Sequence, residues 1–75
     1  MNEPRRKALR KIQYELEDIS QRLQDLIDEE QEAFDNMPES IQGSERGEAM
    51  DEAISNLEYI RYNVDEVSSS IADML

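Results

Sequence analysis

The sequence predicts an all-α fold: an antiparallel two-helix hairpin of the coiled-coil type that dimerises into a four-helix bundle. Apolar residues recur in steps of three and four along two long stretches, and a proline and two glycines separate these stretches. The two stretches are also nearly equal in length, and equal helices joined by a short connector pack antiparallel. Residues 1–75 therefore form one hairpin, with a helix at about 4–36, a connector at 37–43 and a second helix at about 44–74.

The first stretch has the heptad repeat of a helix that packs along one face. Its a positions hold Leu9, Leu16, Leu23, Glu30 and Met37, and its d positions hold Ile12, Ile19, Leu26 and Ala33. Asn2 or Glu3 can cap the start, just before Pro4. Pro38 disfavours helical geometry in the residue before it, so the helix is expected to stop near residue 36.

The second stretch repeats the pattern. Its a positions hold Met50, Leu57, Val64 and Ile71, and its d positions hold Ala53, Ile60, Val67 and Met74. Gly43 and Gly47 bracket the restart, and Ser44 is the expected N-cap. Glu45 and Glu48 lie in the first turn, where the helix dipole favours acidic residues. Residues 38–41 have room for one extra helical turn in the connector.

Apolar residues at e widen the stripe beyond that of a two-stranded coiled coil, towards the face of a bundle helix. They are Ile27, Phe34, Ile54 and Leu75. Two helices cannot cover such a face between them, so we expect self-association, most simply as a C2 homodimer. The expected self-association seam comprises Leu9, Ile12, Leu16, Ile19, Leu23, Leu26, Leu57, Ile60, Val64, Val67 and Ile71.

Composition excludes several classes of function. The chain has no Cys and no His, which rules out zinc sites, disulfides and catalytic triads built on these residues. A net charge of −11 argues against direct nucleic-acid binding, which needs Lys and Arg to neutralise phosphates. No apolar run has the length of a membrane span or of a signal-peptide core. We therefore expect a cytoplasmic protein that needs no cofactor and does not contact the membrane.

Charge is unevenly distributed along the chain. Residues 1–13, the basic segment, carry five cations against Glu3 alone, whereas the rest of the chain has 18 acidic residues and three basic ones. In a hairpin the basic segment lies beside the end of the second helix, near Asp65, Glu66 and Asp73. We expect it to stabilise that end; the alternative is a small docking patch for an anion or a partner.

The opposite end of the hairpin is acidic. Residues 25–52, the acidic end, hold eleven acidic residues and a single cation, Arg46. We predict that it binds a protein partner with a basic surface; the alternative is a solvated surface that provides only solubility. The predicted partner-binding residues are Asp25, Asp28, Glu29, Glu32, Asp35, Glu48, Asp51 and Glu52.

A magnesium-dependent enzyme is a further alternative. The acidic pairs Glu29/Glu32 and Glu48/Asp51 resemble the paired helical motifs of all-α nucleotide pyrophosphohydrolases, and carboxylates are suitable Mg²⁺ ligands. However, a quarter of the residues are acidic, so pairs at this spacing arise by chance. All four also fall at outward heptad positions, where no dry pocket would surround a metal. We therefore expect a protein that is not an enzyme, with no catalytic, cofactor-binding or metal-binding residues.

Four side chains outside the regular pattern have two interpretations each. Glu30 occupies an a position, where it either reaches water or pairs with a cation such as Arg46. Tyr14, Tyr59 and Tyr62 fall off the core face, where they either pack against a neighbouring hairpin or contact a partner.

Residues 29–50, reading EEQEAFDNMPESIQGSERGEAM, resemble a segment of small acidic proteins encoded by phages and prophages. The specific part is the connector DNMPESxQxSERGE. The resemblance implies a helical hairpin acting in the cytoplasm of a host cell, and it supplies no catalytic residues. Small acidic phage proteins often inhibit host defence nucleases, by anti-restriction or anti-CRISPR activity. We thus expect inhibition of a basic, nucleic-acid-handling host protein, such as a CRISPR or restriction nuclease, through DNA mimicry; the alternative is a self-associating structural or accessory phage protein.

Overall fold

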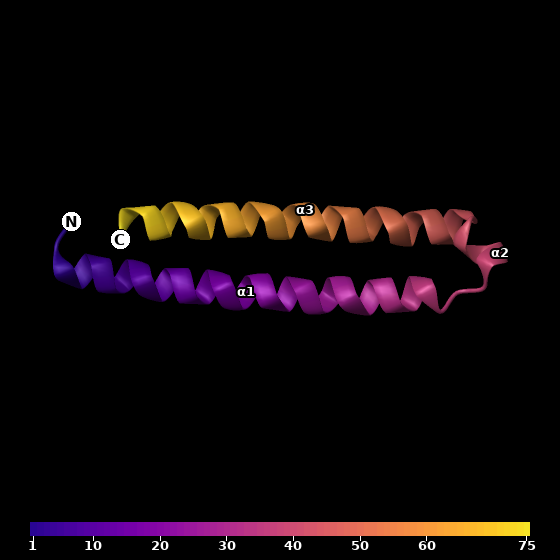
Figure 1. The fold of residues 1–75 in the computed structure, drawn as a ribbon, viewed down its shortest axis with the longest axis horizontal. Coiled ribbons are helices and arrows are strands. Elements are labelled where there is room, and N and C mark those ends of the chain that lie inside the picture. Colours follow the sequence, from indigo (N-terminus) through magenta and orange to yellow (C-terminus); the bar gives the residue numbers. More distant parts are fainter.

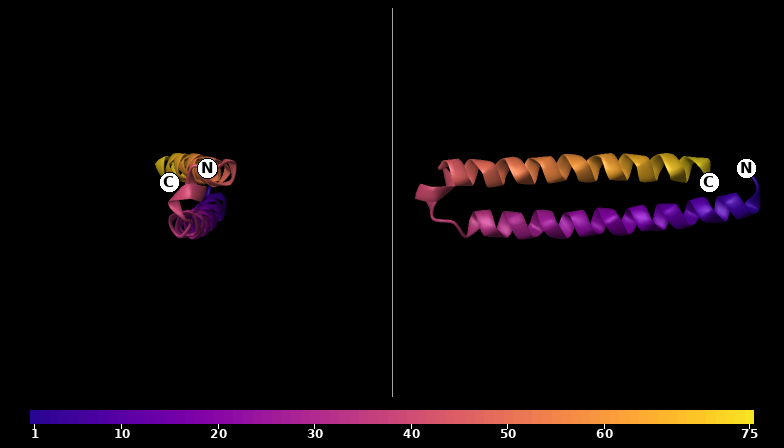
Figure 2. Two further views of the ribbon diagram at one scale, coloured as in Figure 1. Left: turned by 90° about the vertical axis from the view of Figure 1, so that its right-hand side faces the viewer. Right: turned by 180° about the vertical axis from the view of Figure 1, so that it is seen from behind.

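The computed structural model describes residues 1–75, which form a rod of three helices. The long helices α1 (Glu3–Asp35) and α3 (Glu45–Met74) lie side by side and antiparallel, and the single-turn α2 (Glu39–Gln42) joins them (Figures 1 and 2). Both termini lie at the end of the rod opposite α2, and the Cα atoms span 59 × 14 × 12 Å. The predicted all-α fold, with two long helices packed together, is confirmed. None of the helices combines the length and apolar character needed to cross a bilayer.

Side-chain caps fix both long helices at their starts. The Asn2 side chain accepts a hydrogen bond from the Arg5 backbone N–H at 3.0 Å, with Pro4 in the first turn. The Ser44 hydroxyl accepts one from the Gly47 N–H at 3.5 Å. Each cap satisfies a backbone donor that the first helical turn leaves unpaired. The expected N-cap at Ser44 is therefore confirmed.

The connector packs tightly against the helices it joins. The Gln42 side-chain amide donates hydrogen bonds to the carbonyl oxygens of Phe34 and Met37, both at 3.1 Å. Gly47 is buried inside the first turns of α3, and a Cβ atom there would overlap the backbone carbonyl of Gln42. Glycine is therefore required at this position, because the backbone of Gln42 approaches it closely. Gly47 lies within α3, after its first residues.

The contact between the long helices uses mainly a and e positions. The residues of this contact that are buried or half-buried are Leu9, Gln13, Leu16, Ser20, Leu23, Ile27, Glu30 and Phe34 on α1, and Met50, Ile54, Leu57, Arg61, Val64, Ser68 and Ile71 on α3, with Leu75 directly after α3. The large d residues are instead 39–58% exposed: Ile12, Ile19, Leu26, Ile60, Val67 and Met74. The large d residues of the predicted self-association seam therefore lie mainly outside the contact between the two helices.

The choice of e over d has a physical reason near the connector. There the e residues Ile27, Phe34 and Ile54 are large, whereas the d residues Ala33 and Ala53 are small. Burying e therefore removes more apolar surface from water. Ile27 and Ile54 are accordingly the buried large apolar residues, at 6% and 5% exposure, and the long helices carry the same contact face to the other end of the rod.

Candidate protein-interaction surfaces

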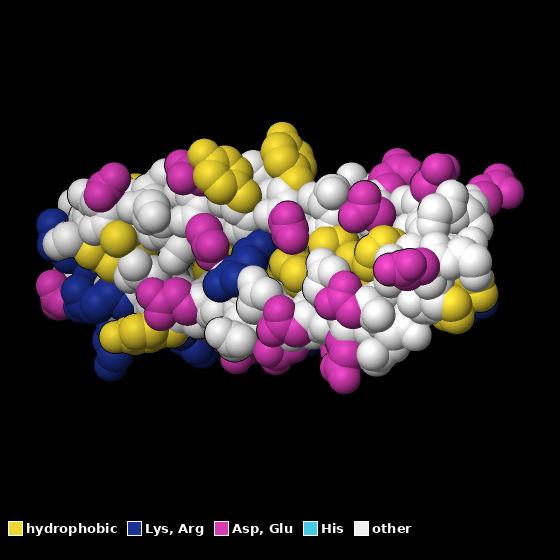
Figure 3. All heavy atoms as spheres, turned by 45° about the vertical axis from the view of Figure 1, so that its right-hand side comes forward, with side chains coloured by type: hydrophobic (Ala, Val, Ile, Leu, Met, Phe, Trp, Pro, Cys, Tyr) yellow, Lys and Arg dark blue, Asp and Glu magenta, His cyan; other side chains and the backbone are white.

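The eight predicted acidic residues are all exposed, and they lie in the part of the rod nearer α2. Figure 3 shows most lysine and arginine side chains at the end of the rod that holds the termini, while acidic side chains extend to the opposite end. Five of the eight belong to α1 and three to α3. The hairpin therefore gathers at one end acidic residues that are far apart in sequence.

These acidic residues form two flanks of the rod. Six of the eight occupy c or f positions, on the side of each helix away from the a/e contact. Since α1 and α3 face each other through that contact, their c and f residues point in opposite directions. We call the five predicted acidic residues on α1 the α1 flank and the three on α3 the α3 flank. Together they give the acidic end negative charge on both sides.

Glutamines hold three carboxylates of the α1 flank in place. Each Gln side chain donates a hydrogen bond to the Asp four residues later. The pairs are Gln21 with Asp25 at 3.1 Å, Gln24 with Asp28 at 2.7 Å and Gln31 with Asp35 at 3.0 Å. Sequence reasoning missed these glutamines, although the repeated spacing from Gln to Asp signals them.

No ion pair neutralises the acidic end. The ion pairs within the chain join Arg10 to Glu3 at 2.5 Å, Arg22 to Asp18 at 4.0 Å and Arg61 to Asp65 at 3.7 Å. None includes Arg46 or any of the eight predicted residues. The acidic end therefore keeps an uncompensated negative potential, which attracts cationic partners.

The basic segment lies beside the C-terminal end of α3, as the hairpin topology requires. Its ion pair, however, stays within α1, between Arg10 and Glu3. Glu66 and Asp73 form no ion pair with it. Asp65 is engaged elsewhere, in the contact between the helices.

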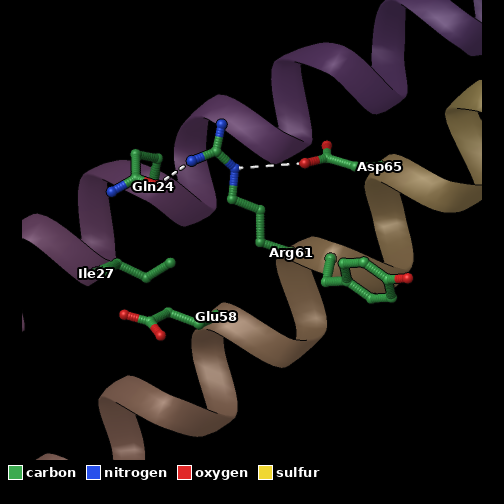
Figure 4. A pocket seen from close by; sticks show the side chains of 6 residues that line it. Gln24, Ile27, Glu58, Arg61 and Asp65 are labelled. Carbon is green, nitrogen blue, oxygen red and sulfur yellow. Dashed lines mark hydrogen bonds and ion pairs between the residues drawn. The ribbon is translucent and has the colours of Figure 1, made fainter.

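A polar layer of Ser20, Gln24, Arg61 and Asp65 interrupts the apolar contact between α1 and α3. The buried Ser20 hydroxyl donates to Asp65 Oδ1 at 2.6 Å and accepts from Arg61 Nε at 3.1 Å. Arg61 Nη1 also donates to Gln24 Oε1, so the guanidinium reaches from α3 across to α1 (Figure 4). Sequence reasoning missed this layer; its signal is a pair of polar residues, Ser20 and Arg61, at e positions that the hairpin brings opposite each other.

The remaining residues of interest lie at the surface or near it. Tyr14, Tyr59 and Tyr62 are all at least 60% exposed. Tyr62 lines a shallow groove beside the polar layer, together with Ile27 and Glu58. Glu30 is half-buried in the helix contact and has no ion pair with Arg46.

The two acidic pairs considered as a magnesium site do not come together. No group of three or more acidic side chains in residues 1–75 is close enough to hold a metal ion.

A second shallow groove lies on the opposite side from the polar layer, where Ile19, Leu23 and Leu26 line it with Arg22. Thus the surface features that could engage a partner are the two acidic flanks and the exposed d residues.

Similarity to known proteins gives no indication of function, so function is inferred from the surfaces described above. No protein-family model matches the chain, and neither does any curated protein or solved structure.

Proposed function

We propose that the protein acts by binding another protein, and that its acidic end occupies a basic, nucleic-acid-binding surface of that partner. One observation carries the proposal: the acidic end holds eleven acidic residues against one cation, and none of the eleven forms an ion pair within the chain. Exposed charges of one sign steer association with a partner of the opposite sign. The proposed activity requires no catalysis and no cofactor.

The charge spacing of the α1 flank supports mimicry of nucleic acid. Its five carboxylates, from Asp25 to Asp35, are distributed over about 15 Å of helix axis. The mean spacing between neighbouring charges is therefore about 3.8 Å, comparable to the phosphate spacing of about 3.4 Å along one DNA strand. With a second acidic flank on α3, the rod offers charge on both sides, as a duplex does. A basic groove shaped for nucleic acid therefore matches it in charge and in elongated form.

The resemblance of residues 29–50 to phage-encoded proteins directs the proposal to a class of target. A host defence nuclease of the restriction or CRISPR type carries the basic nucleic-acid groove that the acidic end fits. Binding there would exclude DNA or RNA and inhibit the nuclease in the host cytoplasm.

The exposed d residues favour a second candidate function, a structural or accessory protein that acts by self-association. Six large apolar side chains at 39–58% exposure are unusual in a monomer that works alone. This function would depend on the exposed d residues, and the acidic end would be dispensable.

Capture from a bacterial lysate tests the proposed function directly. The immobilised full chain is expected to retain a basic protein at about 0.1 M salt and to lose most of it at about 0.5 M. Duplex DNA added to the column should elute the same protein. Reversing four α1-flank charges, with Asp25, Asp28, Glu29 and Glu32 all changed to Lys, should abolish capture.

A matched variant controls for total charge. Changing Glu17, Glu58, Glu66 and Asp73 to Lys alters the net charge by the same amount, but these residues lie outside the acidic end. It should retain capture. Capture that survives the α1-flank reversal, or that resists both salt and DNA, would contradict the proposal.

A further inference from the structure

The exposed d residues form one continuous surface, which we call the apolar stripe: Ile12, Ile19 and Leu26 on α1, and Ile60, Val67 and Met74 on α3. The helices α1 and α3 contact each other through the residues at their a and e positions. On a helix, d lies about 60° from a on the side opposite e. In an antiparallel pair this offset carries the d residues of both helices to the same side of the hairpin. The stripe is therefore a face of the rod, opposite the groove beside the polar layer.

The residues that border the stripe on α3 are uncharged. The g positions beside it hold Asn56, Asn63 and Ser70 on α3, and Glu15, Arg22 and Glu29 on α1. The shallow groove lined by Ile19, Leu23 and Leu26 lies on this face. Burial of this face would remove apolar surface from water, and on the α3 side it would bury no unpaired charged side chain.

We propose that a second copy of this chain covers the apolar stripe, face to face, with the connectors at opposite ends. Ile19 then lies opposite Ile19 of the second copy, and the four long helices form a bundle with a, d and e residues inside. The inference concerns the stripe, which the acidic end borders at Glu29. The two proposals are tested separately, because substitutions in the stripe leave every acidic residue in place. The inference rests on the second candidate function, for which it supplies the interface.

Charge complementarity selects the orientation. With Ile19 opposite its copy, residues 5–11 of one α1 lie opposite residues 27–33 of the other, so each basic segment meets an acidic end. Glu15 similarly lies near Arg22 of the second copy, twice by symmetry. Stacking with both connectors at one end would instead bring the two acidic ends together, with 22 acidic residues against two arginines. Like charges at such close quarters disfavour that arrangement.

The available area matches what a stable dimer needs. A face of 59 × 14 Å, measured between Cα atoms, covers about 800 Å², which is the area that each partner contributes to a standard-size protein interface. The core of this interface would be aliphatic, as in homodimers that associate permanently.

Sedimentation of the full chain tests the association. We expect twice the 8.8 kDa chain mass at micromolar concentration. Ile19→Glu and Ile60→Glu should each raise the dissociation constant at least 100-fold, because each puts a charge into the dry interface twice. Tyr14→Glu and Tyr59→Glu are matched controls: they change equally exposed large residues that lie off the stripe, and should leave the dimer intact.

Cysteine crosslinking tests the orientation without removing the stripe. The chain has no cysteine, so every disulfide reports an introduced residue. Ile19→Cys alone should crosslink to its own copy on mild oxidation, because Cα atoms across the two-fold axis come within disulfide reach. A mixture of Ile19→Cys and Ile60→Cys chains distinguishes the other stacking, in which residue 19 would meet residue 60.

Each outcome decides between the arrangements. A dimer sensitive at Ile19 and Ile60, with the 19–19 crosslink, supports the inference even if a Glu variant unfolds as it dissociates. A dimer insensitive at both positions, or one that forms only the 19–60 crosslink, overturns the proposed interface and leaves self-association standing. A folded monomer at micromolar concentration overturns both the interface and the second candidate function.

Discussion

The half of the hairpin near the connector and the half near the termini bury different kinds of residue at the same heptad positions. Near the connector, the e residues inside the helix contact are Ile27, Phe34 and Ile54, and the d residues include Ala33 and Ala53. Towards the termini, most e residues in the contact are polar, namely Gln13, Ser20, Arg61 and Ser68, with Leu75 as an apolar exception, while large d residues lie outside it.

The comparison shows that a single hairpin buries its large apolar side chains less completely towards the termini than near the connector. Near the connector, the helix contact buries Ile27 and Ile54, although Leu26 remains 49% exposed. Towards the termini, the large d residues face solvent, the a residues are half-buried, and hydrogen bonds through the polar layer join the two helices. Since apolar burial is the main favourable term in folding, the half near the termini needs a further surface to match the other half.

The largest expected effect contrasts two isoleucines, one from each half. Ile54→Ala should lower the free energy of unfolding by about 3 kcal/mol, because Ile54 is 5% exposed. At concentrations where the chain is monomeric, Ile60→Ala should lower it by under about 1 kcal/mol, because Ile60 is 47% exposed. Urea unfolding followed by circular dichroism measures both. Equal losses at low concentration would remove the distinction between the halves.

The next effect tests how tightly the connector packs. Gly47→Ala should lower the free energy of unfolding by about 2 kcal/mol, because the added methyl group overlaps the Gln42 backbone. Gly43→Ala is the matched control. No atom lies within 4 Å of a Cβ at Gly43 and its φ is negative, so this change should be neutral or slightly stabilising. A thermally unchanged Gly47→Ala variant would show that the connector is loosely held.

A smaller effect belongs to the polar layer. Ser20→Ala should lower the free energy of unfolding by about 1 kcal/mol, since it removes two hydrogen bonds and leaves partly exposed partners that water can reach. Ser55→Ala is an exposed serine change with no side-chain hydrogen bond to lose, and should have no effect. If both substitutions behave alike in urea unfolding, the layer does not stabilise the half near the termini.

The smallest effect concerns the acidic residue inside the contact. Glu30→Leu should raise the free energy of unfolding by under about 1 kcal/mol, because Glu30 is half-buried at an a position without a cation. Glu29→Leu, one residue earlier and exposed, should leave the thermal midpoint unchanged. A loss of stability in Glu30→Leu would mean that the carboxylate has a favourable partner in solution.

The pattern of residues could predict most of the fold. Repeats of three and four residues identify the long helices, Pro38 places the break, and Ser44 marks the restart. The sequence alone could not decide between d and e, since each lies within about 60° of a and both hold apolar residues. That choice is made by tertiary packing near the connector, where Ile27 and Ile54 meet and Gly47 admits Gln42.

The candidate surfaces were less predictable. Exposure of the acidic residues follows from their c and f positions, but their division between two flanks depends on which faces of the helices meet. The polar layer joins Ser20 to residues 41 and 45 positions later, and single-chain periodicity does not report contacts at that separation.

Both chain ends emerge at the end of the rod remote from α2. A purification tag or fused domain at either terminus therefore lies away from the acidic end of its own chain. In the proposed dimer, the ends of the two copies lie at opposite tips of a rod 59 Å long. A single-chain tandem would need a linker of at least about 17 extended residues to reproduce it, and a shorter linker would force the two copies to lie with their connectors together.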